Sequence, residues 1–182
     1  MLRTALLALA SFAALSLPAS AQDWTVDHDA SSLGFETTVS GGAVSGAFDA
    51  WTATITLDPD NLDAARIEAS VSTASGATGN RQMDDSMLSN AGLNPPDYET
   101  ARFVSEDVRA TETGYEAHGV MTMRGVEQEM VMPFTLEISD GRAIADSRFT
   151  IARADFGVGG SSWGSAAAEV TLVIHVEADA AE

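Results

Sequence analysis

The sequence LGFETTVSGGAVSGAFDAWTATITL, residues 33–57, carries the alternation of apolar and polar residues that decides the fold. Leu33 and Phe35 share one face of an extended chain, because successive side chains of a strand point to opposite sides. The phase changes by one residue at Asp49-Ala50, and the alternation then continues over residues 51–57. A shift of one residue predicts a β-bulge or a sharp bend within a long strand.

The same two-residue period recurs outward along the chain. It predicts further strands over residues 67–73, 115–123, 130–138, 143–151 and 170–176. Asp140-Gly141 is a hairpin turn signal between two of them. The exception is 81–90, where Met83, Met87 and Leu88 fall at helical spacing ahead of Asn94-Pro95-Pro96, which stops a helix. About eight short antiparallel strands with one short helix indicate an all-β barrel or sandwich.

Residues 1–21 have the features of a cleaved secretory signal. Arg3 precedes an apolar run over residues 5–17, and Ala19-Ser20-Ala21 supplies the small residues of a cleavage site. The run is shorter than the roughly 20 residues of a membrane-spanning helix. We therefore expect a mature chain that begins at Gln22, forms one domain over residues 22–182 and is located in the periplasm.

The composition excludes several classes of function. The chain has no cysteine, so a thiol nucleophile, a zinc–thiolate site and covalently attached haem are excluded. It has 9 basic residues against 27 acidic ones, a formal net charge of −18, and none of the basic residues is lysine. Such a surface repels nucleic acid and anionic lipid head groups, so we expect no nucleic-acid partner.

Five short segments, taken in order, resemble one known family. They are Thr78-Gly79-Asn80 with Asp84, Tyr98 with Phe103, Gly119–Gly125, Arg153-Ala154-Asp155-Phe156-Gly157-Val158, and Glu169-Val170-Thr171-Leu172, and the opening Ser31-Ser32-Leu33-Gly34-Phe35 precedes them. With Trp24 near the start and matching spacing throughout, they are similar to the YceI family of lipocalin-like, polyisoprenoid-binding periplasmic proteins. The resemblance extends over about residues 24–177. It implies an eight-stranded antiparallel lipocalin-like barrel with one short helix.

The same resemblance implies a ligand and partners. The ligand is a polyisoprenoid, an isoprenoid quinone or a related lipid held inside the barrel, and no further cofactor is required. Some members of the family occur with membrane b-type cytochromes, and some pair as homodimers. The resemblance therefore suggests a quinone-linked membrane cytochrome as a partner and a homodimer as an assembly.

The methionines have two interpretations. All six that follow Met1 lie in three stretches, and their pliable side chains either fill gaps in a core or line a cavity that adapts to a flexible chain. The pattern alone favours the gap-filling core, whereas the resemblance favours the cavity. The residues expected to line a ligand are Phe35, Met83, Met87, Leu88, Phe103, Met121, Met123, Met130, Met132, Phe134, Phe149 and Trp163. For Trp163, a place at the rim and a role as a core anchor are equally supported.

Signals for catalysis or metal binding are weak. His28, His118 and His175 match no metal-ligand spacing, and the acids from Asp58 to Asp63 lack the glycine and closing glutamate of a calcium loop. No serine has the partner histidine that a catalytic nucleophile needs, so we expect a binding protein and not an enzyme. The alternative function is a stress-related interaction barrel that is filled and binds no lipid.

Two charged motifs are interpreted structurally. Asp84 and Asp85 are expected to cap and solvate the short helix. Arg153 and Asp155 lie two residues apart, so in a strand they would share a face and form a charge pair that locks the end of the barrel, with contact to the ligand as the alternative.

Overall fold

Strand β11 (Glu169–Ala180) closes the sheet, because it pairs with β10 on one side and with both β1 and β2 on the other. The computed structural model describes residues 21–160 and 163–181. Its elements are β1 (Asp23–Val26), β2 (Ser32–Val39), β3 (Gly42–Phe48), β4 (Trp51–Thr56), β5 (Arg66–Ser72), β6 (Gly76–Ala77), α1 (Arg81–Met87), β7 (Thr100–Ala110), β8 (Tyr115–Met123), β9 (Val126–Ser139), β10 (Arg142–Ala152) and β11. The predicted signal peptide lies outside the described residues except for Ala21.

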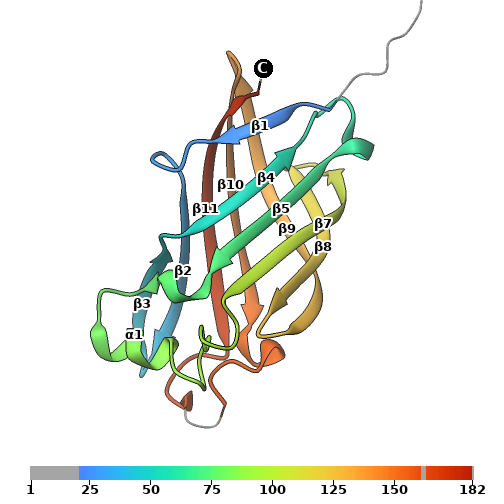
Figure 1. Cartoon of the computed structure of the whole chain (residues 1–182). Helices are drawn as coiled ribbons and strands as arrows, with labels where there is room; N and C mark the ends of the chain where they lie inside the picture. The colour runs from blue at the N-terminus through green and yellow to red at the C-terminus, as the bar shows by residue number, and fades with distance from the viewer. Residues whose placement is uncertain (1–20, 161–162, 182) are drawn as a thin grey trace, which may run out of the picture.

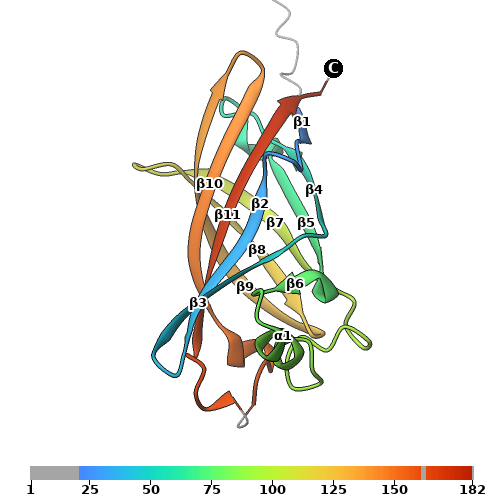
Figure 2. The same ribbon diagram turned by 90° about the vertical axis from the view of Figure 1, so that its left-hand side faces the viewer.

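The closed ring contains eight strands in the order β1-β4-β5-β7-β8-β9-β10-β11, with β11 returning to β1. Strands β2, β3 and β6 extend this ring at the end where α1 lies (Figures 1 and 2). All pairings are antiparallel, so the predicted barrel with one short helix is confirmed.

Two long strands of the barrel are each broken once. Strands β1 and β2 both run along β11, and the chain between them turns at residues 27–31. Strands β3 and β4 are separated by a bend at Asp49-Ala50, where the sequence changes its phase. The predicted bend is therefore confirmed, and it lets both halves of the strand present apolar residues to the same interior.

Tight turns connect the long hairpins. Asp140 and Gly141 adopt φ values of 52° and 79° between β9 and β10, and Arg124 and Gly125 adopt 52° and 72° between β8 and β9. Two successive positive φ values match the right-handed twist of paired strands. The hairpin predicted at Asp140-Gly141 is thus confirmed.

Other boundaries differ from the sequence pattern. Strands β9, β10 and β11 are longer than predicted, because residues beyond the apolar alternation still find ladder partners. Helix α1 ends at Met87 with Leu88 as its C-cap, earlier than the predicted 90. The hydroxyl groups of Ser86 and Ser89 bond to backbone carbonyls in this turn and compete with helix continuation. Strands β1, β6 and β7 were not predicted from the alternation of apolar and polar residues.

Candidate functional site

A cavity of about 580 Å³ occupies the interior of the barrel. Every strand of β2–β5 and β7–β11 contributes inward side chains to its wall, and the helix α1 lies at one end. Strand β11 shows how the alternation builds the wall. Val170, Leu172, Ile174 and Val176 line the cavity, while His175 between two of them faces out. The interior is hollow, which the filled-barrel interpretation did not predict.

Ten of the twelve predicted lining residues lie in the cavity wall. They are Phe35, Met83, Met87, Phe103, Met121, Met123, Met130, Met132, Phe149 and Trp163. Leu88 and Phe134 are not among the lining residues. Leu88 follows Met87 by one residue at the helix end, so its side chain projects in another direction. Phe134 is buried below the cavity and stacks on Tyr115 with 5.4 Å between ring centroids.

All six methionines after Met1 line the cavity. Met121 and Met123 come from β8, Met130 and Met132 from β9, and the remaining pair comes from α1. Sulfur-containing unbranched chains adapt their shape to a flexible apolar molecule better than branched ones do. Their position agrees with the interpretation that the methionines line a cavity and do not merely fill gaps in a core. Their contact with a ligand stays a prediction.

Several cavity residues were missed by the sequence analysis. Ala53, Ile55, Ile67, Ala69 and Val71 line the wall on β4 and β5. These positions do alternate in the sequence, so strand phase could have found them. The prediction gave weight to large and methionine side chains and overlooked the small aliphatic ones.

The barrel is closed at the end away from α1. Trp24, Leu57, Ala117 and Phe134 are at most 9% exposed, belong to one apolar cluster and do not line the cavity. The indole Nε1 of Trp24 donates a hydrogen bond of 2.8 Å to the carbonyl oxygen of Leu57, which satisfies the one polar group of that side chain. The cavity is therefore a blind tunnel with its floor on this cluster.

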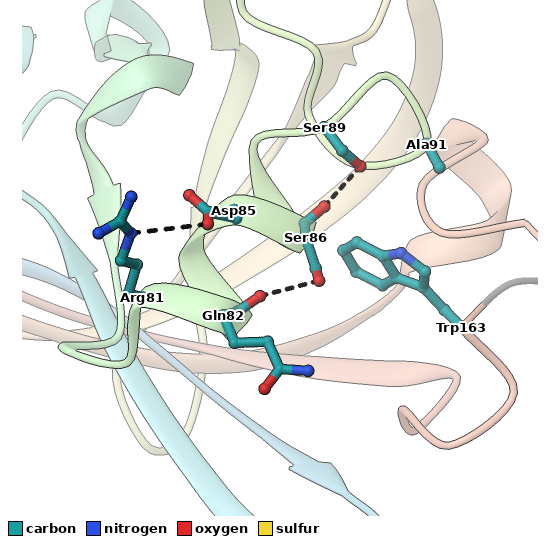
Figure 3. A pocket seen from close by; sticks show the side chains of 7 residues that line it. All are labelled: Arg81, Gln82, Asp85, Ser86, Ser89, Ala91 and Trp163. Carbon is teal, nitrogen blue, oxygen red and sulfur yellow. Dashed lines mark hydrogen bonds and ion pairs between the residues drawn. The ribbon is translucent and has the colours of Figure 1, made fainter.

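The mouth of the tunnel lies beside α1. Apart from Arg102 and Arg153, the polar residues in this part of the lining carry hydroxyls or amides: Thr37, Ser40, Thr78, Asn80, Gln82, Ser86 and Ser165. Outside the mouth is an open groove, the vestibule, lined by Arg81, Gln82, Asp85, Ser86, Ser89, Ala91 and Trp163. Figure 3 shows the indole of Trp163 facing α1 across this groove. Gln82, Ser86 and Trp163 line both spaces, so the vestibule continues into the tunnel.

Helix α1 is fixed at the mouth by its own first turn. The side chain of Asn80 accepts hydrogen bonds from the backbone N–H groups of Gln82 and Met83, as a helix N-cap does. Asp84 accepts from the backbone N–H and the hydroxyl of Thr78, at 2.7 and 2.6 Å. Asp84 therefore anchors the preceding turn, whereas Asp85 is exposed and lies 3.9 Å from Arg81.

The prediction that Arg153 and Asp155 form a charge pair in a strand is wrong. Strand β10 ends at Ala152, and residues Arg153–Phe156 form a 3-10 helix that ends at Gly157 with φ 68°. The guanidinium of Arg153 instead donates to backbone carbonyl groups of the following segment, namely those of Val158, Trp163, Ala166 and Ala167. Arg153 thus holds the segment that carries Trp163 against the mouth.

Arginines near the tunnel are committed to other partners. Arg102 is half exposed on the outer face of β7 and pairs with Glu68, and Arg81 projects into solvent beside Asp85. Arg124 donates to the carbonyl oxygens of Asn90 and Gly92 and lies over the ring of Tyr98. With Arg153 bound to carbonyl oxygens, the exposed Arg81 in the vestibule, 3.9 Å from Asp85, is the cation least committed to the protein among the residues described at the mouth.

A model of the YceI-like domain matches residues 24–178 of the chain. The protein belongs to the YceI-like family. No curated protein matches it significantly in sequence. The family model covers the whole barrel from β1 to β11, so the blind tunnel and its mouth both fall within the YceI-like domain.

Solved structures share the YceI-like fold at low identity. BcnA of Burkholderia cenocepacia superimposes with a TM-score of 0.79 at 24% identity, covering 84% of this chain and 98% of its own. The Campylobacter jejuni YCEI protein gives 0.67 at 21%, covering 76% and 86%. A domain from Saccharophagus degradans, described as polyisoprenoid-binding and implicated in plant cell wall breakdown, gives 0.67 at 13%, covering 89% and 99%.

The histidines of the YceI-like barrel lie away from its interior. His175 on β11 is 2.7 Å from Asp146 and 3.3 Å from Glu177, and His118 is 3.3 Å from Glu116. His28 packs edge-on against Trp51, with 4.6 Å between ring centroids. Among residues 21–160 and 163–181, no group of three or more histidine or acidic side chains could hold a metal ion.

An ionic cluster at the closed end joins strands β10 and β11 to the β1–β2 turn. Arg142 on β10 binds Asp27, Glu177 and Asp179, at 3.0, 2.8 and 3.0 Å. Hydrogen bonds from Arg142, and then from His175, lower the pKa of Glu177. Hydrogen bonds to Asp146 and then to Glu177 raise the pKa of His175.

Within the described residues, none of the helices has the length and hydrophobicity needed to cross a lipid bilayer.

Proposed function

We propose that this protein binds a long apolar lipid, a polyisoprenoid or an isoprenoid quinone, inside the barrel and carries it without altering it chemically. The observation that carries the proposal is the blind tunnel of about 580 Å³ with its apolar wall. Pockets of this size hold molecules with the bulk of a small lipid. Membership of the YceI-like family and the fold shared with a polyisoprenoid-binding domain support the same ligand class.

Burial of the lipid chain supplies enough free energy for this function. Each buried methylene contributes about 0.8 kcal/mol, so ten carbons contribute roughly 8 kcal/mol before the cost of ordering the chain. A net binding free energy of about 8 kcal/mol corresponds to a micromolar dissociation constant, and carbons buried beyond the first ten offset the ordering cost. The tunnel therefore needs no charged anchor.

The polar groups at the mouth favour a neutral head group. Most of them are hydroxyls and amides. The lining arginines Arg102 and Arg153 bind a carboxylate and carbonyl oxygens of the protein itself, and Arg81 in the vestibule lies 3.9 Å from Asp85. A diphosphate would have to displace one of these partners and approach a chain of net charge −18. A quinone ring or an alcohol meets neither obstacle, so we propose a quinone-like or neutral head.

The side chains of the interior support binding rather than catalysis. Along most of its length the wall is aliphatic, aromatic or methionine. At the mouth, the Ser86 hydroxyl bonds to the carbonyl of Gln82 and has no base beside it, and the Asp84 oxygen that accepts from the Thr78 hydroxyl also accepts from the Thr78 backbone N–H and so anchors the turn.

We propose that the carrier works in the periplasm after removal of residues 1–21. There it would take its lipid from, or deliver it to, a membrane protein, and a b-type cytochrome that handles quinones is the partner that the family resemblance suggests. Homodimer formation is a further part of this proposal. The acidic surface would keep the carrier from adsorbing to anionic membrane lipids between these encounters.

Calorimetric titration of the delipidated mature chain tests the ligand class. The probes are a prenyl alcohol, a prenyl quinone and a prenyl diphosphate with equal tails. We expect the alcohol and quinone to bind with micromolar or tighter affinity and the diphosphate to bind on the order of tenfold more weakly. Lack of binding by all three would contradict the carrier, and tightest binding of the diphosphate would contradict the neutral head.

Two neighbouring substitutions on β9 provide a matched control. Met130 faces the tunnel, whereas Val131 is 42% exposed on the outer face. Met130→Asn should weaken binding of the alcohol on the order of tenfold, because it places an amide against the tail. Val131→Asn should leave the affinity unchanged. Equal effects of the two substitutions would place the ligand outside the barrel.

A further inference from the structure

The floor of the tunnel is rigid packed core. Ile55, Ile67 and Met132 line the cavity and also pack against the buried cluster that contains Trp24 and Leu57. That cluster has no polar group in need of a partner, since the Trp24 indole is bonded to the Leu57 carbonyl. A tail that reaches the floor cannot continue without breaking this packing, so the tunnel has a fixed depth.

The volume of the cavity gives the length of the lipid tail that it can hold. A water molecule in the liquid takes up about 30 Å³, and we assign the same volume to each non-hydrogen atom of the ligand. The cavity of about 580 Å³ then holds on the order of 20 such atoms. An isoprenoid unit has five carbons, so the tunnel accommodates about four units.

One pair of alanines keeps the middle of the tunnel open. Ala53 on β4 and Ala69 on β5 are directly paired, and both line the cavity. The flanking pairs are larger: Trp51 with Val71 on one side, and Ile55 with Ile67 on the floor side. The alanine pair contributes only two methyl groups, so this level of the barrel has room that its neighbours fill.

Resting on the proposed function, we propose that the blind tunnel measures its ligand: it takes about four isoprenoid units, the packed floor sets that length, and Ala53 and Ala69 keep the passage to the floor open. Any longer tail leaves its remaining units, with the head group, at the mouth and in the vestibule beside Trp163. The vestibule is open to solvent and offers polar side chains along α1 (Figure 3), so units placed there gain little from burial.

A series of prenyl alcohols with two to eight units tests the depth. The dissociation constant should fall on the order of tenfold with each added unit up to about four, and less than about twofold for each unit beyond. A steady gain through eight units would overturn the length limit while leaving lipid binding intact. Absence of binding across the series would overturn both the limit and the proposed function.

Variants at the alanine pair test whether it keeps the passage to the floor open. Ala69→Phe should move the plateau to about two units, because the ring blocks the passage to the floor. Thr54→Phe, on the outer face of β4, is the matched control and should leave the plateau at four. A plateau that stays at four in the folded Ala69→Phe variant would overturn the assignment.

A milder substitution guards against misfolding. Ala69→Leu adds less volume and should still shorten the plateau by about one unit, with an unchanged circular dichroism spectrum. If both folded variants bind the whole series as the parent does, the alanine pair does not control the passage to the floor.

Discussion

The guanidinium of Arg153 lies against the indole of Trp163, with its Cζ 5.6 Å from the ring centroid. The same guanidinium donates to carbonyl oxygens on both sides of that tryptophan. One side chain therefore holds both the backbone and the aromatic ring at the mouth of the tunnel. Gly159 completes the arrangement, because a Cβ at its φ of 94° would meet the Trp163 ring at 2.7 Å.

Arg153→Lys should destabilise the fold, because an ammonium group cannot reach the several carbonyl oxygens that the planar guanidinium serves. Hydrogen bonds to a charged group contribute about 1.5–3 kcal/mol each, and we expect a net loss of about 2 kcal/mol in the free energy of unfolding. Urea unfolding followed by circular dichroism measures it. Arg148→Lys is the control, since Arg148 is exposed and, within the described part of the chain, pairs with Glu36 alone, and it should leave the midpoint nearly unchanged. Equal shifts would contradict the role assigned to Arg153.

Gly119→Ala should cost about 3 kcal/mol of stability. A Cβ at this position would fall on the carbonyl oxygen of Val104 and within 2.8 Å of the Ser105 Cα, and backbone atoms of a paired strand cannot move aside. Gly41 is the matched control: its φ is 79°, but a Cβ there meets nothing within 4 Å. Gly41→Ala should cost only the left-handed strain of about 1–2 kcal/mol. Thermal unfolding compares the two, and a smaller loss for Gly119→Ala would contradict the close approach of β7 and β8.

His175→Gln should lower stability at mildly acidic pH and have little effect at alkaline pH. The pKa of His175 is raised above its ordinary value of 6.5 by Asp146 and Glu177. The charged form is thus favoured by folding, so its stabilisation is fully present below pH 6.5 and is lost as the pH rises through the raised pKa. Urea midpoints of both proteins, measured from pH 5 to pH 9, should converge as the pH rises. A difference that grows with pH would show that the sign is wrong.

Expression of the full chain with its leader in a Gram-negative host should yield a periplasmic protein that begins at Gln22. Gln22 is part of the barrel, since its carbonyl oxygen accepts a hydrogen bond of 2.8 Å from the backbone N–H of Leu57. Fractionation and intact-mass measurement test this expectation. Ala21→Leu, which removes the small residue at the cleavage site, should leave the leader attached. Retention of the parent in the cytoplasm with residues 1–21 in place would contradict the proposed location.

Strand phase explains why the sequence predicted so much of the barrel. Residues that alternate between a buried and a solvated face specify both their strand and their register, and the shift at Asp49-Ala50 was readable because it reverses that alternation. Strand β1 was missed because it has four residues and too short a pattern. Strand β7 alternates through Ala101, whose small side chain weakens the apolar signal, and its pairing with β8 contains a bulge between Ser105 and Asp107.

The site was harder to predict than the barrel. Alternation identifies an inward residue but not its level along the tunnel, so Phe134 was placed on the cavity although it lies in the packed floor. Arg153 was misread because a strand was assumed to continue past Ala152, and the left-handed Gly157 that ends the 3-10 helix has no distinctive local pattern. Whether the methionines fill or surround space depends on the summed volume of all strands, which no local segment contains.

Native mass spectrometry of the mature protein, isolated from the periplasm of its own source and then extracted with organic solvent, tests the central claim most directly. If the barrel carries a lipid, we expect a discrete added mass that is recovered in the extract as an isoprenoid alcohol or quinone. A protein that carries no added mass and also binds none of the prenyl probes in titration would contradict the account, and the barrel would then have to act through its outer surface.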